Sequence, residues 1–144
     1  MKYRTLGRTG FKVSDIAHGL WGMGGWSGSD DEESLQALQL AVDLGCNFFD
    51  SAWAYGDGKS DGLLGQIIAR NERQRLYAAS KIPPNNLRWP ASPSSNYGDV
   101  FPSDHVFSYA DLIRKQLDTE TIDLLQFHVW DDHWTDEPAF RNTV

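Results

Sequence analysis

The sequence predicts an α/β fold of parallel strands, of the (β/α)8 TIM-barrel type, present as roughly its first half. Three apolar, β-prone segments, residues 48–56, 76–81 and 122–128, each carry or lead to polar side chains at their ends. Helical periods separate them, and alternating strand–helix units of about 30 residues or more are typical of parallel sheets with right-handed crossovers. Polar residues at the carboxyl ends of such strands are typical of the catalytic face of a barrel.

The chain begins with a short β-hairpin over residues 3–14, in which Gly7 and Gly10 supply the turn. Residues 15–20 follow as the expected first strand of the sheet. The glycine-rich loop over residues 21–28 lacks the G-x-G-x-x-G spacing of a phosphate-binding turn. Because glycine permits close approach of the backbone, this loop is better explained as one that lies beside a flat ligand.

Two helices flank the second core strand. Ser29 or Asp30 is expected to cap a helix over residues 31–44, because acidic residues fill its first turn. Residues 48–52 form the strand, and a second helix opens at residues 60–61.

The third strand covers residues 76–82 and leads into a proline-rich segment, residues 83–104, which holds five of the six prolines. We expect this segment to be irregular and to act as a functional excursion or a mobile lid, because it is too long for an ordinary connection. A helical period returns over residues 105–118, the fourth strand covers residues 122–128, and residues 136–144 resemble the start of another helix.

Composition indicates one globular domain over residues 1–144, with a net charge of −7 that argues against nucleic acid as a partner. No apolar run reaches the roughly 20 residues of a membrane span, and the first five residues lack the apolar core of a signal peptide. Cys46 is the only cysteine, so no internal disulfide is possible and a cytoplasmic location is expected.

Four side chains lie at or just beyond predicted strand ends: Asp50, Tyr55, Lys81 and His128. A tyrosine hydroxyl has a pKa of about 10, so a nearby ammonium is needed for it to act as an acid near neutral pH. Lys81 can supply this charge, Asp50 can hold Lys81 by an ion pair, and His128 can orient a substrate carbonyl. Tyr55 would then protonate the carbonyl oxygen as hydride arrives.

Each residue also has a simpler explanation. Asp50 can cap a turn, Tyr55 can be a surface aromatic, Lys81 can be solvated, and His128 can be a satisfied core histidine. Four coincident strand ends favour a site, because unrelated residues would scatter over both faces of the sheet. Tryptophans in the predicted loops at the strand ends can form the walls of a small-molecule pocket or serve ordinary packing: Trp21, Trp26 and Trp53.

A metal site is a further alternative, since oxygen and imidazole ligands suit zinc or iron. Its candidate ligands are His128, Asp131, Asp132 and His133, with His105 as an additional one. Their spacing matches no established motif, and the acidic pair is better explained as a solvated loop or a helix cap. We therefore expect no bound metal.

Taken together, these segments resemble the aldo-keto reductases, in the branch that includes bacterial reductases and potassium-channel β-subunits. Residues 3–14 are similar to the family's N-terminal hairpin, and residues 47–56 to its Asp/Tyr signature, with Ser51 where threonine is usual. Residues 80–81 and 121–128 resemble its lysine and histidine strands. Departures include Ala17-His18 in the first strand, Asp61 where glutamate is common, and Ile113-Arg114 in place of a Ser-Leu pair.

The resemblance implies a catalytic tetrad of Asp50, Tyr55, Lys81 and His128, with Tyr55 as proton donor. It places Trp21 and Asp50 near the nicotinamide and ribose of NADPH, with NADH as a possible substitute. The expected activity is reversible reduction of aldehydes or ketones to alcohols. Aromatic side chains favour an apolar or aromatic carbonyl substrate, although sugars also stack on tryptophan.

Family members run to roughly twice this length, the usual span of the barrel, and their later strands supply most contacts to the cofactor. A half barrel leaves its first and fourth strands as unpaired edges, so we expect self-association through them. The alternative to a reductase is a non-catalytic truncated family member or subunit that keeps the tetrad without a complete cofactor site.

Overall fold

The computed structural model describes residues 1–143 as a β-hairpin followed by a four-stranded parallel sheet. The hairpin pairs β1 (Tyr3–Thr5) with β2 (Lys12–Ser14) in antiparallel register. The sheet has the order β3-β4-β5-β6, so strands that follow one another in the chain are neighbours. Its strands are β3 (His18–Gly19), β4 (Phe48–Asp50), β5 (Tyr77–Ile82) and β6 (Leu124–Phe127).

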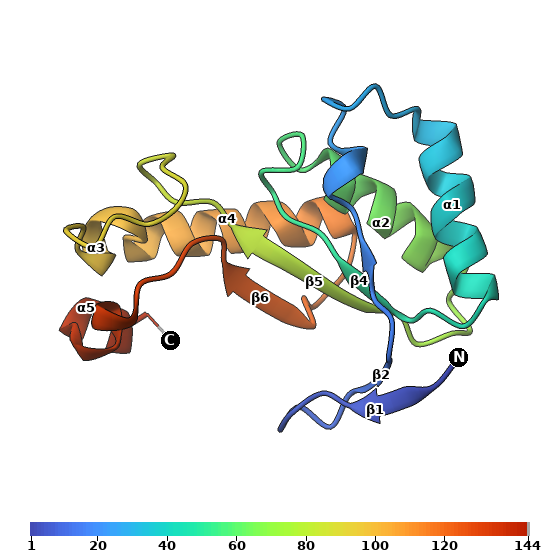
Figure 1. Cartoon of the computed structure of the whole chain (residues 1–144), viewed down its shortest axis with the longest axis horizontal. Helices are drawn as coiled ribbons and strands as arrows, with labels where there is room; N and C mark the ends of the chain where they lie inside the picture. Colours follow the sequence, from blue (N-terminus) through green and yellow to red (C-terminus); the bar gives the residue numbers. More distant parts are fainter. Residues whose placement is uncertain (144) are drawn as a thin grey trace.

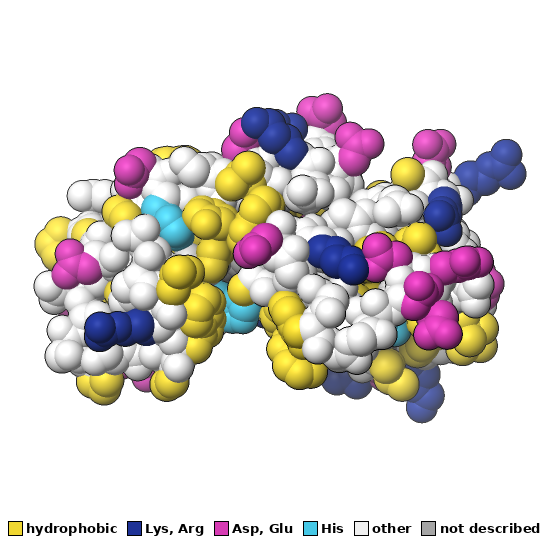
Figure 2. Space-filling model, turned by 90° about the horizontal axis from the view of Figure 1, so that it is seen from above, with side chains coloured by type: hydrophobic (Ala, Val, Ile, Leu, Met, Phe, Trp, Pro, Cys, Tyr) yellow, Lys and Arg dark blue, Asp and Glu magenta, His cyan; other side chains and the backbone are white. Residues whose placement is uncertain are grey.

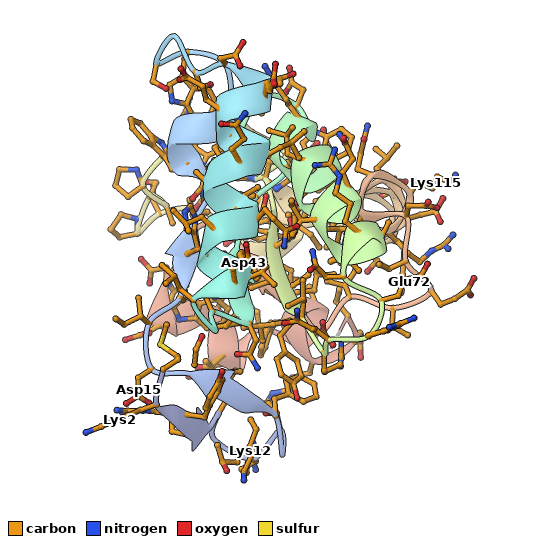
Figure 3. The ribbon with its side chains drawn as sticks, turned by 90° about the vertical axis from the view of Figure 1, so that its right-hand side faces the viewer. Lys2, Lys12, Asp15, Asp43, Glu72 and Lys115 are labelled. Atoms are coloured by element: carbon orange, nitrogen blue, oxygen red, sulfur yellow. The ribbon has the colours of Figure 1, made fainter. Side chains whose placement is uncertain are left out.

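Three longer helices connect the strands: α1 (Asp31–Asp43), α2 (Lys59–Arg70) and α4 (Ser103–Leu117). Figure 1 shows the hairpin below the sheet and these helices running beside the strands that they connect. Figure 3 shows α1 and α2 side by side, with Lys2, Lys12 and Asp15 around the hairpin at the other end of the molecule. Parallel strands with crossover helices confirm the predicted partial barrel.

The first strand is shorter than predicted. Residues 15–17 leave the sheet, and only His18–Gly19 pair with β4. The Ser14 hydroxyl donates to the Ile16 carbonyl at 2.7 Å, and Asp15 pairs with Arg4 at 2.6 Å. These local bonds fold the backbone into a bend, and the Ile16 side chain is left 67% exposed. A side-chain bond to the nearby backbone therefore competes with the strand ladder here.

The predicted helix over residues 31–44 is confirmed as α1. The Asp30 carboxylate caps it by accepting from the backbone of Glu32 and Glu33 at 2.9 and 3.0 Å. Its buried stripe, which includes Leu38 and Val42, joins a core made of the sheet, α2 and α4.

The proline-rich segment is not irregular throughout, which corrects the prediction for its second half. A one-turn helix, α3 (Tyr97–Val100), lies within it, and α4 already begins at Ser103. Tyr97 is fully buried, and its ring lies 5.5 Å from that of Phe127 and 6.1 Å from that of Trp134. Burial of aromatic side chains therefore holds the second half of the segment against the core. The high proline content of the segment does not indicate this stabilisation.

After β6 the chain forms a 3-10 turn, η2 (Asp132–Asp136), and a one-turn helix, α5 (Pro138–Arg141). Asp131 caps η2 by accepting from the His133 backbone at 3.3 Å, as expected for a helix cap. The predicted helix over residues 136–144 is thus limited to α5, and Val144 lies outside the described residues. Across residues 1–143, no helix combines the length and the hydrophobicity needed to cross a bilayer.

Candidate active site

The carboxyl ends of β4, β5 and β6 bring the four predicted side chains together. Asp50 is the last residue of β4, Lys81 lies in β5, and His128 directly follows β6. Tyr55 belongs to the turn between β4 and α2. In the parallel register Lys81 is opposite Gln126, and β5 and β6 end level with one another. Strand β4 ends earlier, because its last residue, Asp50, is opposite Ala79 of β5.

An ion pair forms the centre of the site. The Lys81 ammonium donates to both carboxylate oxygens of Asp50, at 2.8 and 2.9 Å, and to the Ser51 carbonyl at 2.7 Å. These three acceptors match the three protons of an ammonium. The Lys81 side chain is only 15% exposed, whereas that of Asp50 is 41% exposed. The lysine is therefore held in one position, and the carboxylate keeps a side open to solvent.

Tyr55 lies between the ammonium and the histidine. The Lys81 ammonium lies 5.3 Å from the centre of the Tyr55 ring, and the Tyr55 and His128 rings meet edge to face with centroids 5.6 Å apart. Burial, together with the charge of Lys81, holds the pKa of His128 below its usual value, and Asp50 opposes this effect. His128 is therefore neutral near pH 7 and can donate one hydrogen bond from its ring.

Aromatic side chains surround Tyr55 and His128. The Trp26 ring lies 6.1 Å from Tyr55, and the Trp89 ring lies 5.8 Å from His128. A hollow of about 330 Å³ opens between them, lined by Trp21, Trp26, Ala54, Tyr55, Trp89 and His128. Figure 2 looks down from above the view of Figure 1 and shows histidine side chains set among hydrophobic ones near the middle of that face.

For three tryptophans the sequence left open a pocket wall or ordinary packing, and Trp21 and Trp26 line the hollow. Trp53 does not line the hollow, because its ring packs edge to face on Tyr109 of α4 at 5.5 Å. Trp89, which does line the hollow, comes from the proline-rich segment and was not predicted. The only sequence feature that points to a role for Trp89 in the site is its position in a segment that is too long for an ordinary connection between a strand and a helix.

A buried polar cluster behind the ion pair was also missed. Ser51, Ser60, Asp61 and Ser80 are each 0% exposed. The sequence suggested that Ser60 and Asp61 merely open α2, yet α2 begins at Lys59, with Gly58 at its N-cap in the left-handed region. Burial raises the pKa of Asp61 to about 6, although the Ser51 and Ser80 hydroxyls and the charge of Lys81 oppose that rise.

The alternative of a metal site finds no support. Among residues 1–143, no group of three or more His, Cys, Asp or Glu side chains is placed to hold an ion. His133 instead bonds to Asp131 at 2.6 Å and to the Ser95 carbonyl at 3.0 Å, while His105 bonds to the Pro83 carbonyl at 2.7 Å. These imidazoles already have structural partners.

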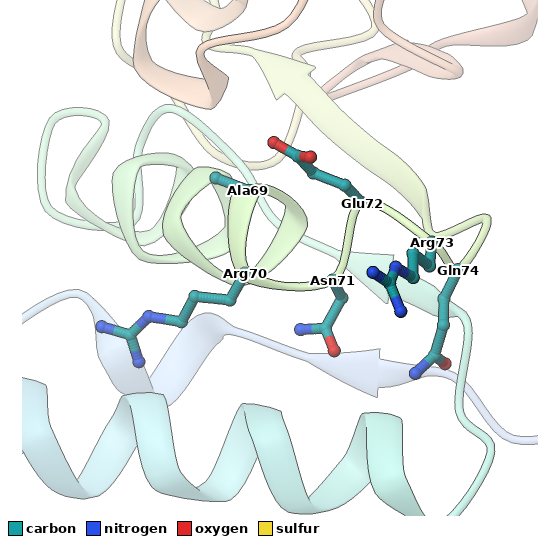
Figure 4. A pocket seen from close by; sticks show the side chains of 6 residues that line it. All are labelled: Ala69, Arg70, Asn71, Glu72, Arg73 and Gln74. Atoms are coloured by element: carbon teal, nitrogen blue, oxygen red, sulfur yellow. The ribbon is translucent and has the colours of Figure 1, made fainter.

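A second hollow lies at the end of α2, far from the strand ends that carry Asp50, Lys81 and His128. Figure 4 shows its lining side chains: Ala69, Arg70, Asn71, Glu72, Arg73 and Gln74. Asn71 exchanges hydrogen bonds with Gln39 of α1 at 3.0 and 3.1 Å. The hollow lies before the amino end of β5, the side of a barrel that serves stability rather than chemistry.

The parallel sheet, its connecting helices and a polar site at the strand ends define a partial α/β barrel with an enzyme-like centre. The model of the Aldo/keto reductase family matches residues 15–142 of this chain. The chain therefore belongs to the aldo/keto reductase family, as the resemblance indicated.

Individual relatives agree with this assignment. Aldo-keto reductase YhdN of Bacillus subtilis is 31% identical over 144 residues, covering 92% of this chain and 39% of the relative. The crystal structure of a thermostable aldo-keto reductase, Tm1743, in complex with the inhibitor epalrestat is 31% identical, with a TM-score of 0.72; the match covers 92% of this chain and 44% of that one.

A crystal structure of an aldo-keto reductase from Klebsiella pneumoniae in complex with NADPH shares the fold. Its identity is 24% and its TM-score is 0.66, with coverage of 91% of this chain and 40% of that one. The present chain thus spans about two fifths of the length of the relatives that it matches.

Proposed function

We propose that this chain carries the proton-transfer centre of an NADPH-dependent carbonyl reductase that converts aldehydes or ketones to alcohols. The observation that supports this most strongly is the Lys81 ammonium, which binds Asp50 at 2.8 Å and lies 5.3 Å from the Tyr55 ring. Lysine held in this way stabilises a negative charge on the phenolic oxygen. Membership of the aldo/keto reductase family supports the same reaction class.

In the proposed reaction, the Tyr55 hydroxyl gives its proton to the oxygen of a substrate carbonyl, whose carbon would receive the hydride that a bound NADPH would supply. The ammonium of Lys81 compensates the charge left on Tyr55, and Asp50 keeps that ammonium in place. Neutral His128 donates a hydrogen bond to the carbonyl oxygen and orients it. Proton transfer by a positioned side chain of this kind contributes about 10²- to 10⁴-fold to a rate.

The residues present suit the nicotinamide end of NADPH, which supplies the hydride when bound. The hollow beside Tyr55 is lined by flat aromatic side chains, including Trp21, which is 61% exposed. The Asp50 carboxylate is 41% exposed and can accept a hydrogen bond from a ribose hydroxyl while it still holds Lys81. NADH presents the same ring and ribose, so these residues do not distinguish the two cofactors.

The competing proposal is a non-catalytic family member that retains the tetrad without a complete cofactor site. The specific observation in its favour is the similarity to a probable voltage-gated potassium channel subunit beta of Arabidopsis thaliana, which is 30% identical over 128 residues and is named as a subunit rather than as an enzyme.

Tyr55→Phe tests the proposal. We expect NADPH-dependent turnover of an aromatic aldehyde to fall by about 10²- to 10⁴-fold, because the ring is kept and the proton donor is lost. The matched control is Tyr77→Phe, which deletes a hydroxyl at the amino end of β5 and is expected to retain turnover. Equal activity in both variants would exclude Tyr55 as the acid, and an inactive wild-type chain would favour the non-catalytic alternative.

A further inference from the structure

Four buried polar side chains that the proposed reaction does not use lie directly behind the ion pair of the site. Ser51, Ser60, Asp61 and Ser80 are each 0% exposed. The Ser51 and Ser60 hydroxyl oxygens lie 2.7 Å apart, and the Ser80 hydroxyl donates to Asp61 Oδ1 at 2.9 Å. We name these four residues the buried polar cluster.

The buried polar cluster connects α2 to the two strand ends that carry the ion pair. Ser51 directly follows Asp50, and Ser80 directly precedes Lys81. Successive side chains of a strand point to opposite faces, so the serine side chains point away from the face that carries the ion pair. Their partners, Ser60 and Asp61, belong to the first turn of α2.

Burial of Asp61 at this position lowers the stability of the folded protein. The Oδ2 atom of Asp61 has no hydrogen-bond partner among the described residues, although the side chain is fully buried. A buried carboxylate with an unsatisfied oxygen is destabilising, and an apolar side chain would avoid that cost. Departures of this kind from good packing are expected mainly where function requires them.

We propose that Asp61 is a positioning residue: by accepting the Ser80 hydroxyl, it fixes the end of β5 from which Lys81 reaches Asp50. The inference rests on the proposed function, because it gives Asp61 a task in the reaction only if Lys81 has one. A carboxylate suits this task, since it only accepts hydrogen bonds and so holds the serine in a single orientation. Asparagine keeps one acceptor oxygen, whereas leucine keeps none.

The test uses nuclear magnetic resonance of the Lys81 ammonium in ¹⁵N-lysine-labelled protein. Held by three oxygens, this ammonium is expected to exchange its protons slowly in the wild type. We expect the signal to be lost in Ser80→Ala and Asp61→Leu and to be recovered in Asp61→Asn. The matched control is Ser34→Ala, which deletes a hydroxyl from a buried serine of α1 and should leave the signal intact.

A kinetic measurement complements the spectroscopic one. In the reduction of an aldehyde by NADPH, Ser80→Ala is expected to lower kcat roughly 10- to 100-fold, as for a misplaced catalytic group, with KM unchanged. If Ser80 had a merely structural role, Ser80→Ala would instead lower the amount of folded protein, and the folded fraction would not show a lower kcat at unchanged KM.

Together, the NMR and the kinetic measurements distinguish the positioning role of Asp61 from the proposed reductase function. Loss of the Lys81 signal in Ser80→Ala, combined with an inactive wild type, would support positioning and count against the reductase. An unchanged signal in folded Ser80→Ala would overturn the positioning role, whether or not Asp61→Leu folds. Loss of the signal in Asp61→Asn as well would also overturn it, because the charge rather than the hydrogen bond would then be responsible.

Discussion

In the Asp50–Lys81 ion pair the lysine is the more buried partner. Loss of its counter-charge should therefore lower the stability of the protein. Lys81 is 15% exposed and donates two of its three hydrogen bonds to Asp50. Asp50→Asn removes the counter-charge and leaves a sheltered ammonium with weaker acceptors. We expect the free energy of unfolding in urea to fall by about 1–3 kcal/mol.

The control for this substitution is Asp111→Asn. Asp111 pairs with Arg114 and Lys115 on the surface of α4, where all three side chains are more than 40% exposed. Exposed pairs of this kind contribute about 0–1 kcal/mol. An equal loss in the two variants would show that the site pair is no more than a surface ion pair.

Asp61 makes the stability of the protein depend on pH. Its pKa rises from 3.8 to about 6 on folding, so between these values the folded state holds a proton that the unfolded state releases. The contribution of Asp61 to the free energy of unfolding therefore falls as pH rises from about 4 to about 6, by about 3 kcal/mol, and is constant above.

Asp61→Asn isolates this contribution. The pKa values of His18 and His128 are lowered by burial, so their contribution to stability falls as pH drops below about 6.5, the opposite sign. Both histidines are present in each protein, and their effect cancels in the difference between wild type and variant. Urea unfolding across pH 4–7 should show the stability of the Asp61→Asn variant, relative to wild type, growing from about pH 4 to about pH 6 and constant above. Parallel curves would refute a buried, ionisable Asp61.

At the residue scale, the proximity of Asp50, Tyr55, Lys81 and His128 could be predicted because each lies at or just beyond the end of an apolar strand. The ion pair between Asp50 and Lys81 followed from that placement. The buried polar cluster could not be predicted, since serine and aspartate near a helix start are most often caps. Their burial depends on how closely α2 approaches the sheet, which the local pattern does not encode.

At the scale of elements, α2 and α4 meet where glycine is required. A Cβ atom added at Gly65 would lie 2.7 Å from the Leu117 carbonyl oxygen and 2.9 Å from that of Gln116. Backbone atoms cannot move aside as the end of a side chain can. We therefore expect Gly65→Ala to lower the free energy of unfolding by about 1–3 kcal/mol, as measured by thermal or urea unfolding.

Gly62→Ala is the matched control on the same helix. A Cβ atom there would lie 3.2 Å from the Gln116 side-chain oxygen, which can move. Because alanine has the higher helix propensity, this change is expected to be neutral or to stabilise by up to about 1 kcal/mol. A similar loss in both variants would indicate helix disruption rather than close contact between α2 and α4.

Element boundaries were predicted well where hydrophobic periodicity decides them, as in α1 and β5. They were wrong where side chains override it. The Ser14 hydroxyl bends the chain before β3, and the burial of Tyr97 orders part of a segment rich in proline. Both are effects of individual contacts, which periodicity does not record.

At the scale of the whole molecule, β3 and β6 are the two edges of an open parallel sheet. Unpaired strand edges favour pairing with another chain. We therefore expect concentration-dependent self-association of the purified protein in sedimentation velocity. Leu125, which is 36% exposed on β6, offers a test, because Leu125→Lys places a charge on that edge and should weaken association.

Leu44→Lys serves as the control, since Leu44 is 65% exposed at the end of α1, away from β6. Equal weakening by both substitutions would point to general surface hydrophobicity. A wild-type chain that stays monomeric across the concentration range would contradict the prediction.

The most direct test of the central claim, that these strand ends form a reductase centre, is a titration of the purified 144-residue chain with NADPH. Binding is followed through quenching of tryptophan fluorescence, to which Trp21 and Trp26 beside Tyr55 should contribute. We predict saturable quenching at micromolar NADPH. Absence of binding up to millimolar NADPH would contradict the account and leave the tetrad without a source of hydride.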